Sequence, residues 1–177
     1  MSHLRPESQA TFLLRLLEPR YTSILEPYAK RCKVLDLYKF KCTCEACRNS
    51  EPFDARRRAY DSAMISSKEL SDWATKNLHL PDDYIVNKAL KQIQMLEDDK
   101  LENSPYYKGH LVTILYSYLA LGDRAKSREW GEKLGRWRSF RNGPAAAEMY
   151  FDEKFYGKEN KFWEIRLEAK GKAHKER

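Results

Sequence analysis

The chain has 177 residues, of which 42% are hydrophobic and 33% charged, a balance typical of a folded protein with one sizeable core. No apolar run approaches the roughly 20 residues of a membrane-spanning helix, and the first residues lack the basic start and apolar core of an export signal. Lysine and arginine exceed aspartate and glutamate by 33 to 26, so the net charge of +7 is compatible with an acidic partner but identifies none.

Residues 1–26 contain one apolar run, at positions 12–17. Its length does not distinguish a buried strand from a short helix. Pro19 and Pro27 bracket the segment that follows. From residue 27 to residue 37 the pattern predicts a helix, because proline is well tolerated at a first helical position.

A cluster of cysteines follows this helix. The chain has four cysteines, and three of them, Cys42, Cys44 and Cys47, form a C-x-C-x2-C motif. Thiolates this close together can bind one tetrahedral zinc ion. A disulfide is a poor alternative, since Cys42 and Cys44 are too near in the chain to pair comfortably. The motif therefore predicts a zinc site, and unligated structural cysteines are the other interpretation.

The fourth ligand of such a site stays open. Cys32 is the remaining cysteine and lies on the predicted helix, where it also fits a half-buried small apolar position. His3 and His79 follow no spacing rule that would bring an imidazole to the cluster. Water and a missing upstream cysteine are the other candidates, and a zinc ion held by three cysteines alone would keep an open position and bind more weakly.

The residues around the cysteines resemble a known family. From Arg31 to Cys47 they read R-x-x-V-x-x-x-Y-x-F-x-C-x-C-x2-C. This pattern resembles the end of a SET domain and its post-SET zinc segment, as found in protein-lysine methyltransferases of the SMYD class and related fungal SET-domain proteins. The resemblance implies that the three cysteines bind zinc, that Phe40 packs on the adenine of S-adenosylmethionine, and that Tyr38 lies beside that pocket and the lysine channel.

Other parts of a SET domain are missing from the sequence. The N-H-x-C segment of the catalytic core does not occur. Residues 1–26 occupy the place where that core would end, and Ile24 stands where the catalytic tyrosine is expected. Tyr21 would take that place only if the alignment shifted by three residues. The resemblance thus predicts a C-terminal fragment or degenerate paralogue of a lysine methyltransferase, zinc-binding but not catalytic alone.

Residues 51–169 are predicted to form a helical domain, followed by a frayed basic tail at 170–177. Four residues are expected to cap helices: Asp54, Ser66, Asp82 and Ser104. Ser66 is followed by Glu69 in a capping-box pattern, and Ser104 precedes a proline. Further helices are expected to carry Tyr150, Phe151 and Phe155, and then Phe162, Trp163, Ile165 and Leu167.

A pair of helices stands out within this domain. Apolar residues from Tyr107 to Leu119 share one face, a Gly122-Asp123 turn follows, and Trp130, Leu134 and Trp137 lie on the next helix. Gly131 and Gly135 each cost helix stability, which predicts the close approach of another helix. The unit loosely resembles a tetratricopeptide hairpin. SMYD-class proteins carry such a helical domain after the post-SET cysteines.

Two features within the pair allow two interpretations each. His110 lies on the apolar face, where a satisfied core or boundary histidine is expected rather than a ligand. Residues 136–141 interleave basic and aromatic side chains as nucleic-acid-binding segments do. The same pattern arises where Trp137 and Phe140 close a core while arginines favour the helix C-terminus.

These observations predict a mainly α fold, with a tetratricopeptide-like helical domain behind a small post-SET zinc segment at residues 27–50. Zinc is the expected cofactor, and S-adenosylmethionine is implied by the resemblance alone. The expected partner is a protein or peptide, such as a histone or another lysine-bearing substrate in full-length relatives. The alternative is a non-catalytic helical interaction module, and nucleic-acid binding through the positive charge is a weaker third hypothesis. Reduced cysteines point to the nucleus or cytoplasm, without a membrane.

Overall fold

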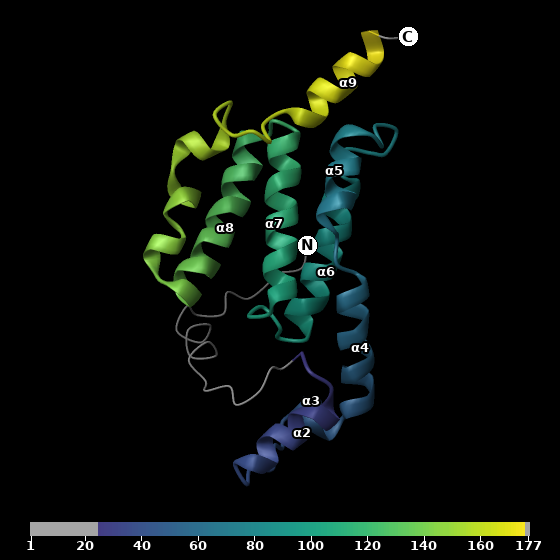
Figure 1. Ribbon diagram of the computed structural model, residues 1–177, viewed down its shortest axis with the longest axis vertical. Coiled ribbons are helices and arrows are strands. Elements are labelled where there is room, and N and C mark those ends of the chain that lie inside the picture. The colour runs from purple at the N-terminus through teal and green to yellow at the C-terminus, as the bar shows by residue number, and fades with distance from the viewer. Residues whose placement is uncertain (1–24, 176–177) are drawn as a thin grey trace, which may run out of the picture. The chain divides into compact units, whose positions relative to one another are not determined.

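The computed structural model describes residues 25–175, and in this range the chain is helical and contains no β-strand (Figure 1). The mainly α prediction is therefore confirmed. The apolar run at 12–17, Tyr21 and Ile24 lie outside the described residues. The chain forms two compact units, which divide between Ala59 and Tyr60. None of the described helices is both long and apolar enough to span a membrane.

The first unit contains α2 (Tyr28–Leu37), α3 (Glu45–Arg48) and the first part of α4 (Ser50–Ser62), which continues into the second unit. Asp54 was expected to begin a helix, but it lies inside α4. Its carboxylate accepts the backbone N–H of Tyr28 at 2.9 Å and pairs with Arg57 at 3.1 Å. Asp54 thus caps α2 through a tertiary contact, because the N–H groups at a helix start need acceptors.

The end of α2 turns the chain toward the cysteines. Lys39 adopts a left-handed conformation with φ 53°. The backbone N–H of Phe40 donates to Leu35 O at 3.1 Å, and that of Lys39 to Asp36 O at 3.0 Å. This bonding pattern is a Schellman motif, which usually has glycine at the left-handed position. The chain accepts lysine there at a cost of roughly 1 kcal/mol.

The second unit is built around α7 (Pro105–Ala120), which packs against α6 (Tyr84–Asp98) and α8 (Arg124–Asn142) (Figure 1). The helix α5 (Ser67–Thr75) contacts α7 and α9 (Ile165–Lys175). Side chains with no exposed surface fill the core between these helices: Ile85, Leu96, Leu111, Ile114, Leu115, Leu119 and Leu134. The apolar face predicted from Tyr107 to Leu119 is therefore the buried face of α7.

Two of the four predicted caps are confirmed. Ser66 Oγ accepts the N–H of Glu69 at 3.0 Å, and Ser104 Oγ accepts that of Tyr107 at 3.1 Å. Asp82 does not begin α6, which starts at Tyr84. Its carboxylate binds the guanidinium of Arg166 at 2.7 Å instead.

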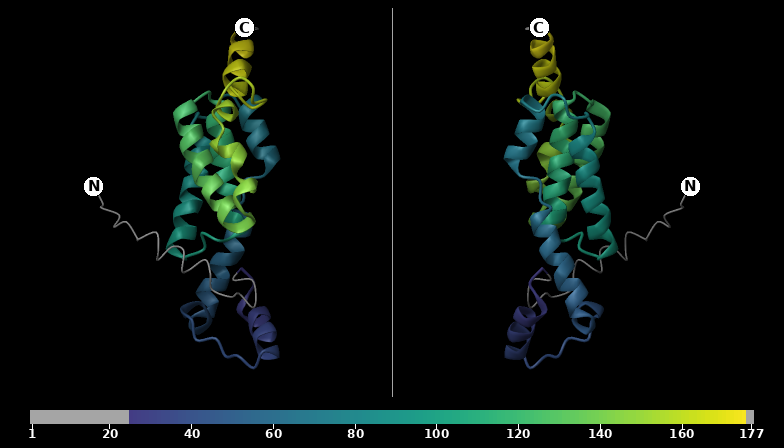
Figure 2. Two further views of the ribbon diagram at one scale, coloured as in Figure 1. Left: turned by 90° about the vertical axis from the view of Figure 1, so that its left-hand side faces the viewer. Right: turned by 90° about the vertical axis from the view of Figure 1, so that its right-hand side faces the viewer.

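Three 3₁₀ turns cover the side of α8 that faces away from α7: Pro144–Ala146, Glu148–Phe151 and Glu153–Tyr156 (Figures 1 and 2). One helix carrying Tyr150, Phe151 and Phe155 was predicted here, and the chain forms separate 3₁₀ turns instead. The close approach predicted at the two glycines of α8 is present, because a Cβ on Gly131 would overlap the ring and hydroxyl of Tyr156. A Cβ on Gly135 would lie 3.0 Å from the ring of Phe151.

The guanidinium of Arg166 fastens α9 to the rest of the second unit. Arg166 has no exposed surface, and its guanidinium lies 4.4 Å from the ring centre of Trp73. It donates to the backbone carbonyls of Trp73 and Leu80 and pairs with Asp82. The helix continues through residues 170–175, which were expected to fray, and Lys170 also binds Asp82 at 2.6 Å.

Candidate metal site

Three thiols converge in the first unit. The Sγ atoms of Cys42, Cys44 and Cys47 all lie within 4.8 Å of one another. Cys44 is exposed, and the other two are half-buried. The three residues singled out by their spacing in the sequence therefore meet in space.

The local fold explains this convergence. Cys44 caps α3 with an extended backbone, and its carbonyl accepts the N–H groups of Cys47 and Arg48 at 3.0 Å. This single helical turn brings the Cys47 side chain back toward Cys44. Cys42 approaches from the residues before the turn, which belong to no helix or strand. Ala46, on the same turn, is buried and anchors α3 to the unit.

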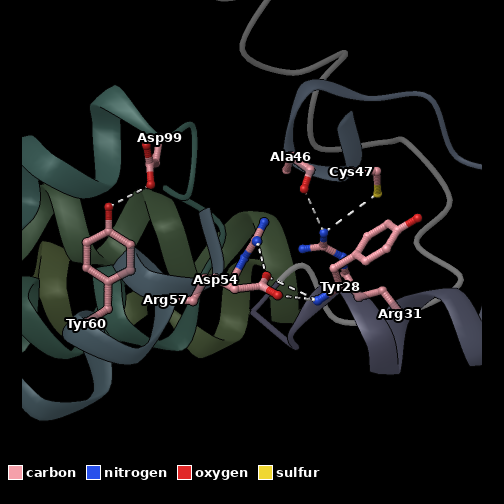
Figure 3. A network of polar contacts seen from close by, with 8 residues as sticks. All are labelled: Tyr28, Arg31, Ala46, Cys47, Asp54, Arg57, Tyr60 and Asp99. Atoms are coloured by element: carbon pink, nitrogen blue, oxygen red, sulfur yellow. Dashed lines mark hydrogen bonds and ion pairs between the residues drawn. The ribbon is translucent and has the colours of Figure 1, made fainter. Parts of the chain in front are cut away.

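Arg31 on α2 braces the cysteine segment from below (Figure 3). Its side chain is buried, with 4% of the residue exposed. Its Nη2 donates to Ala46 O at 3.1 Å and to Cys47 Sγ at 3.6 Å. Sequence reasoning gave Arg31 no role, although it is the first residue of the pattern that runs to Cys47. A buried guanidinium beside a thiol stabilises negative charge on the sulfur.

The thiols influence one another's protonation. Burial acts to raise the pKa of Cys44, but hydrogen bonds with Cys42 and Cys47 and the charge of Arg31 outweigh it and lower that pKa. Burial and the neighbouring thiols raise the pKa of Cys47 to about 12. The cluster thus holds one thiolate-prone sulfur, that of Cys44, beside the Cys47 thiol, which keeps its proton until a cation replaces it.

The donor set fits zinc. Sulfur ligands on a tetrahedral zinc ion, each about 2.3 Å from the metal, lie about 3.8 Å from one another. The three Sγ atoms, already within 4.8 Å, need only small side-chain movements to reach that spacing. The three cysteines could therefore bind a metal ion, and three thiolates favour zinc among the common ions.

Among the described residues, no fourth cysteine, histidine or carboxylate belongs to the cluster. Cys32 lies on α2 outside the trio. A hydrogen bond with the Cys32 thiol raises the pKa of the exposed Tyr28 hydroxyl. His79 belongs to the second unit, and His3 lies outside the described residues.

The two aromatic residues implicated by the resemblance stand at the exposed end of α2. Tyr38 is 59% exposed and Phe40 is 49% exposed, and both precede the cysteines. The left-handed turn at Lys39 lies between them. Two large aromatic surfaces thus face solvent next to the cluster in the sequence.

Comparison of the chain with family models, with curated proteins and with solved structures found no match.

Proposed function

We propose that this chain binds zinc through Cys42, Cys44 and Cys47 and corresponds to the post-SET segment and C-terminal helical domain of a SET-domain protein-lysine methyltransferase. The meeting of the three thiols within 4.8 Å supports the metal site most directly. The resemblance from Arg31 to Cys47 supports the family. The predicted tetratricopeptide-like character of the helical domain belongs to this proposal as well.

In this proposal the metal holds the segment that carries the aromatic residues. The exposed rings of Tyr38 and Phe40 would then form one wall of a pocket for S-adenosylmethionine, with Phe40 against the adenine. We expect no methyl transfer by this chain alone. The N-H-x-C segment is absent from the sequence, and Ile24 replaces the expected tyrosine.

Metal analysis of the reduced full chain tests the site. We expect one zinc ion per chain, and we expect it to be lost in Cys44→Ser. Cys32→Ser, which alters the cysteine outside the trio, is the matched control and should retain the metal. A zinc-free wild-type chain, or equal zinc in Cys44→Ser, would contradict the metal assignment.

Calorimetric titration of the zinc-loaded chain with S-adenosylmethionine tests the family assignment separately. Binding that weakens in Phe40→Ala supports a residual cofactor pocket. Absence of binding by a fully metal-loaded chain would refute that pocket and leave the zinc site standing.

A non-catalytic helical interaction module is the second candidate function. A groove of about 450 Å³ between α5 and α9 favours it. Leu78, Ile165, Ala169 and Ala173 give this groove an apolar floor, and Glu168 and Lys172 add charges of both signs. An amphipathic peptide is the ligand that suits such a surface. Absence of S-adenosylmethionine binding together with zinc binding would favour this candidate.

A further inference from the structure

A second groove, unrelated to the cysteine cluster, lies on the second unit between the start of α7 and the end of α8. Its volume is about 300 Å³. It is lined by Pro105, Lys108, Trp137, Arg138, Arg141 and Asn142. Half of these residues are cationic and none is acidic. Among the described residues, no carboxylate forms an ion pair with any of the three cations.

The fold alone does not account for all of this charge. Arg138 and Arg141 lie near the C-terminus of α8, where the helix dipole favours cations. Lys108 lies close to the N-terminus of α7, where the dipole disfavours a cation. Lys108 and Arg138 are also half-buried. A bound anion would relieve this unfavourable concentration of positive charge.

Aromatic rings hold the arginines in place. The Arg141 guanidinium lies 5.2 Å from the ring centre of Trp137 and donates to Asn103 O at 2.8 Å. Trp137 is itself fixed, because its Nε1 donates to Glu102 O at 2.7 Å. The Arg138 guanidinium lies 5.4 Å from the ring centre of Tyr150. Flat indole and guanidinium surfaces of this kind are those on which nucleic-acid bases stack.

We propose that this groove binds single-stranded nucleic acid. Lys108, Arg138 and Arg141 contact the phosphates, and a base lies against the indole of Trp137 beside the Arg141 guanidinium. The interleaved basic and aromatic residues at 136–141 thus act as a binding segment. Phe140, which was expected to close the core, is instead exposed, and Trp137 is half-buried. The net charge of +7 favours a polyanion, and the fixed aromatic surface favours nucleotides over an acidic peptide, which has no bases to stack.

Fluorescence anisotropy on the full chain tests this proposal, with a fluorescein-labelled oligouridylate of about 12 nucleotides as the probe. Binding is measured between about 50 and 200 mM salt, because each phosphate contact contributes about 0.7 to the slope of log K against log salt. We expect Arg138→Gln/Arg141→Gln to weaken binding about tenfold and to lower the slope by about 1.4.

The matched control is Lys91→Gln/Lys158→Gln, which removes the same charge from exposed positions outside the groove. This control should leave the affinity and the salt slope almost unchanged, apart from a small effect of the lower net charge. Equal losses in both double variants would overturn the proposal, since binding would then depend on net charge alone. Displacement of the oligonucleotide by inorganic phosphate or polyglutamate at equal charge concentration would also overturn it. Thermal unfolding of each variant shows whether the fold is retained.

Discussion

Three buried polar residues are the positions where single substitutions should have the most specific effects. Arg31 braces the cysteines, Arg166 fastens α9, and His110 is enclosed in the core with 1% of its surface exposed. Each of these residues has few ways to replace a lost partner, because water does not reach it. Substitutions at these positions should therefore have specific effects that exposed residues of the same type do not show.

Replacing Arg31 with methionine is expected to weaken zinc binding about 10- to 100-fold, the usual effect of losing a group that orients a metal ligand. Methionine fills the space of the buried side chain but donates no hydrogen bond to Ala46 O or Cys47 Sγ. Competition with a chromophoric chelator measures the affinity. The control is Arg48→Gln, an exposed arginine on α3. Unchanged affinity in the Arg31 variant would show that the brace has no role in metal binding.

His110 should make the second unit sensitive to mild acid. Burial and the charge of Lys88 lower the pKa of His110 to about 4, and the Nδ1 atom has no hydrogen-bond partner among the described residues. The unfolded chain, with a histidine pKa near 6.5, therefore binds the proton more readily than the folded chain. Stability is complete above about pH 6.5 and falls as the pH drops toward 4, with a loss of about 2 kcal/mol at pH 5.

Urea unfolding at pH 7 and pH 5 measures this loss. His110→Leu should remove most of the difference between the two pH values, and His174→Gln, at an exposed position, should keep it. The expectation of a core histidine is confirmed, but its hydrogen bonding is incomplete. If wild type and the His110 variant lose equal stability between these pH values, carboxylates rather than His110 cause the acid sensitivity.

At the scale of helices, sequence prediction succeeded where the determining contacts were local. Ser66 and Ser104 each accept a hydrogen bond from the backbone N–H of the residue three positions later. The capping pattern is therefore visible in a few adjacent residues. Asp54 and Asp82 have the same chemistry, yet their carboxylates bind Tyr28 and Arg166, which are remote in sequence. No local pattern distinguishes these two cases.

The site shows the same division between local and remote contacts. The spacing of Cys42, Cys44 and Cys47 predicted their convergence, because one short turn brings them together. The bond from Arg31 to Cys47 depends on how α2 meets α3, and only the structure reveals it. The family resemblance and the S-adenosylmethionine pocket stay predictions.

The glycines of α8 and α9 provide a matched test of helix packing. Gly131→Ala is expected to destabilise the second unit by about 1–3 kcal/mol, because the added methyl group overlaps the Tyr156 ring. Gly171 lies on α9 with open space around its Cα. Gly171→Ala should therefore stabilise the chain by up to about 1 kcal/mol through helix propensity.

Urea unfolding followed by tryptophan fluorescence measures both changes, since all four tryptophans lie in the second unit. Equal effects of the two substitutions would mean that the 3₁₀ turns do not press against α8. A stabilising Gly131→Ala would have the same meaning.

At the scale of the whole molecule, the division into two compact units predicts separate responses to metal removal. Zinc binding stabilises the folded form of the residues that supply its ligands. All three candidate ligands lie in the first unit. A chelator should therefore loosen that unit and leave the core around α7 intact.

Hydrogen exchange and fluorescence separate the two responses. We expect amides between residues 25 and 59 to exchange faster after chelation, while the melting temperature reported by tryptophan fluorescence stays unchanged. Cys44→Ser should reproduce the exchange pattern without a chelator. A fall in the tryptophan melting temperature on chelation would show that the two units unfold together.

The anchoring of Arg166 also bears on how the protein is made. Its partner carbonyl in Trp73 precedes it by 93 residues, and that of Leu80 by 86. During translation, both carbonyls emerge from the ribosome long before the guanidinium that will bind them. Until residue 166 has been synthesised, those two carbonyls lack the partner that binds them in the folded chain, so a product that terminates upstream of codon 166 should be recognised by chaperones and proteases as incompletely folded.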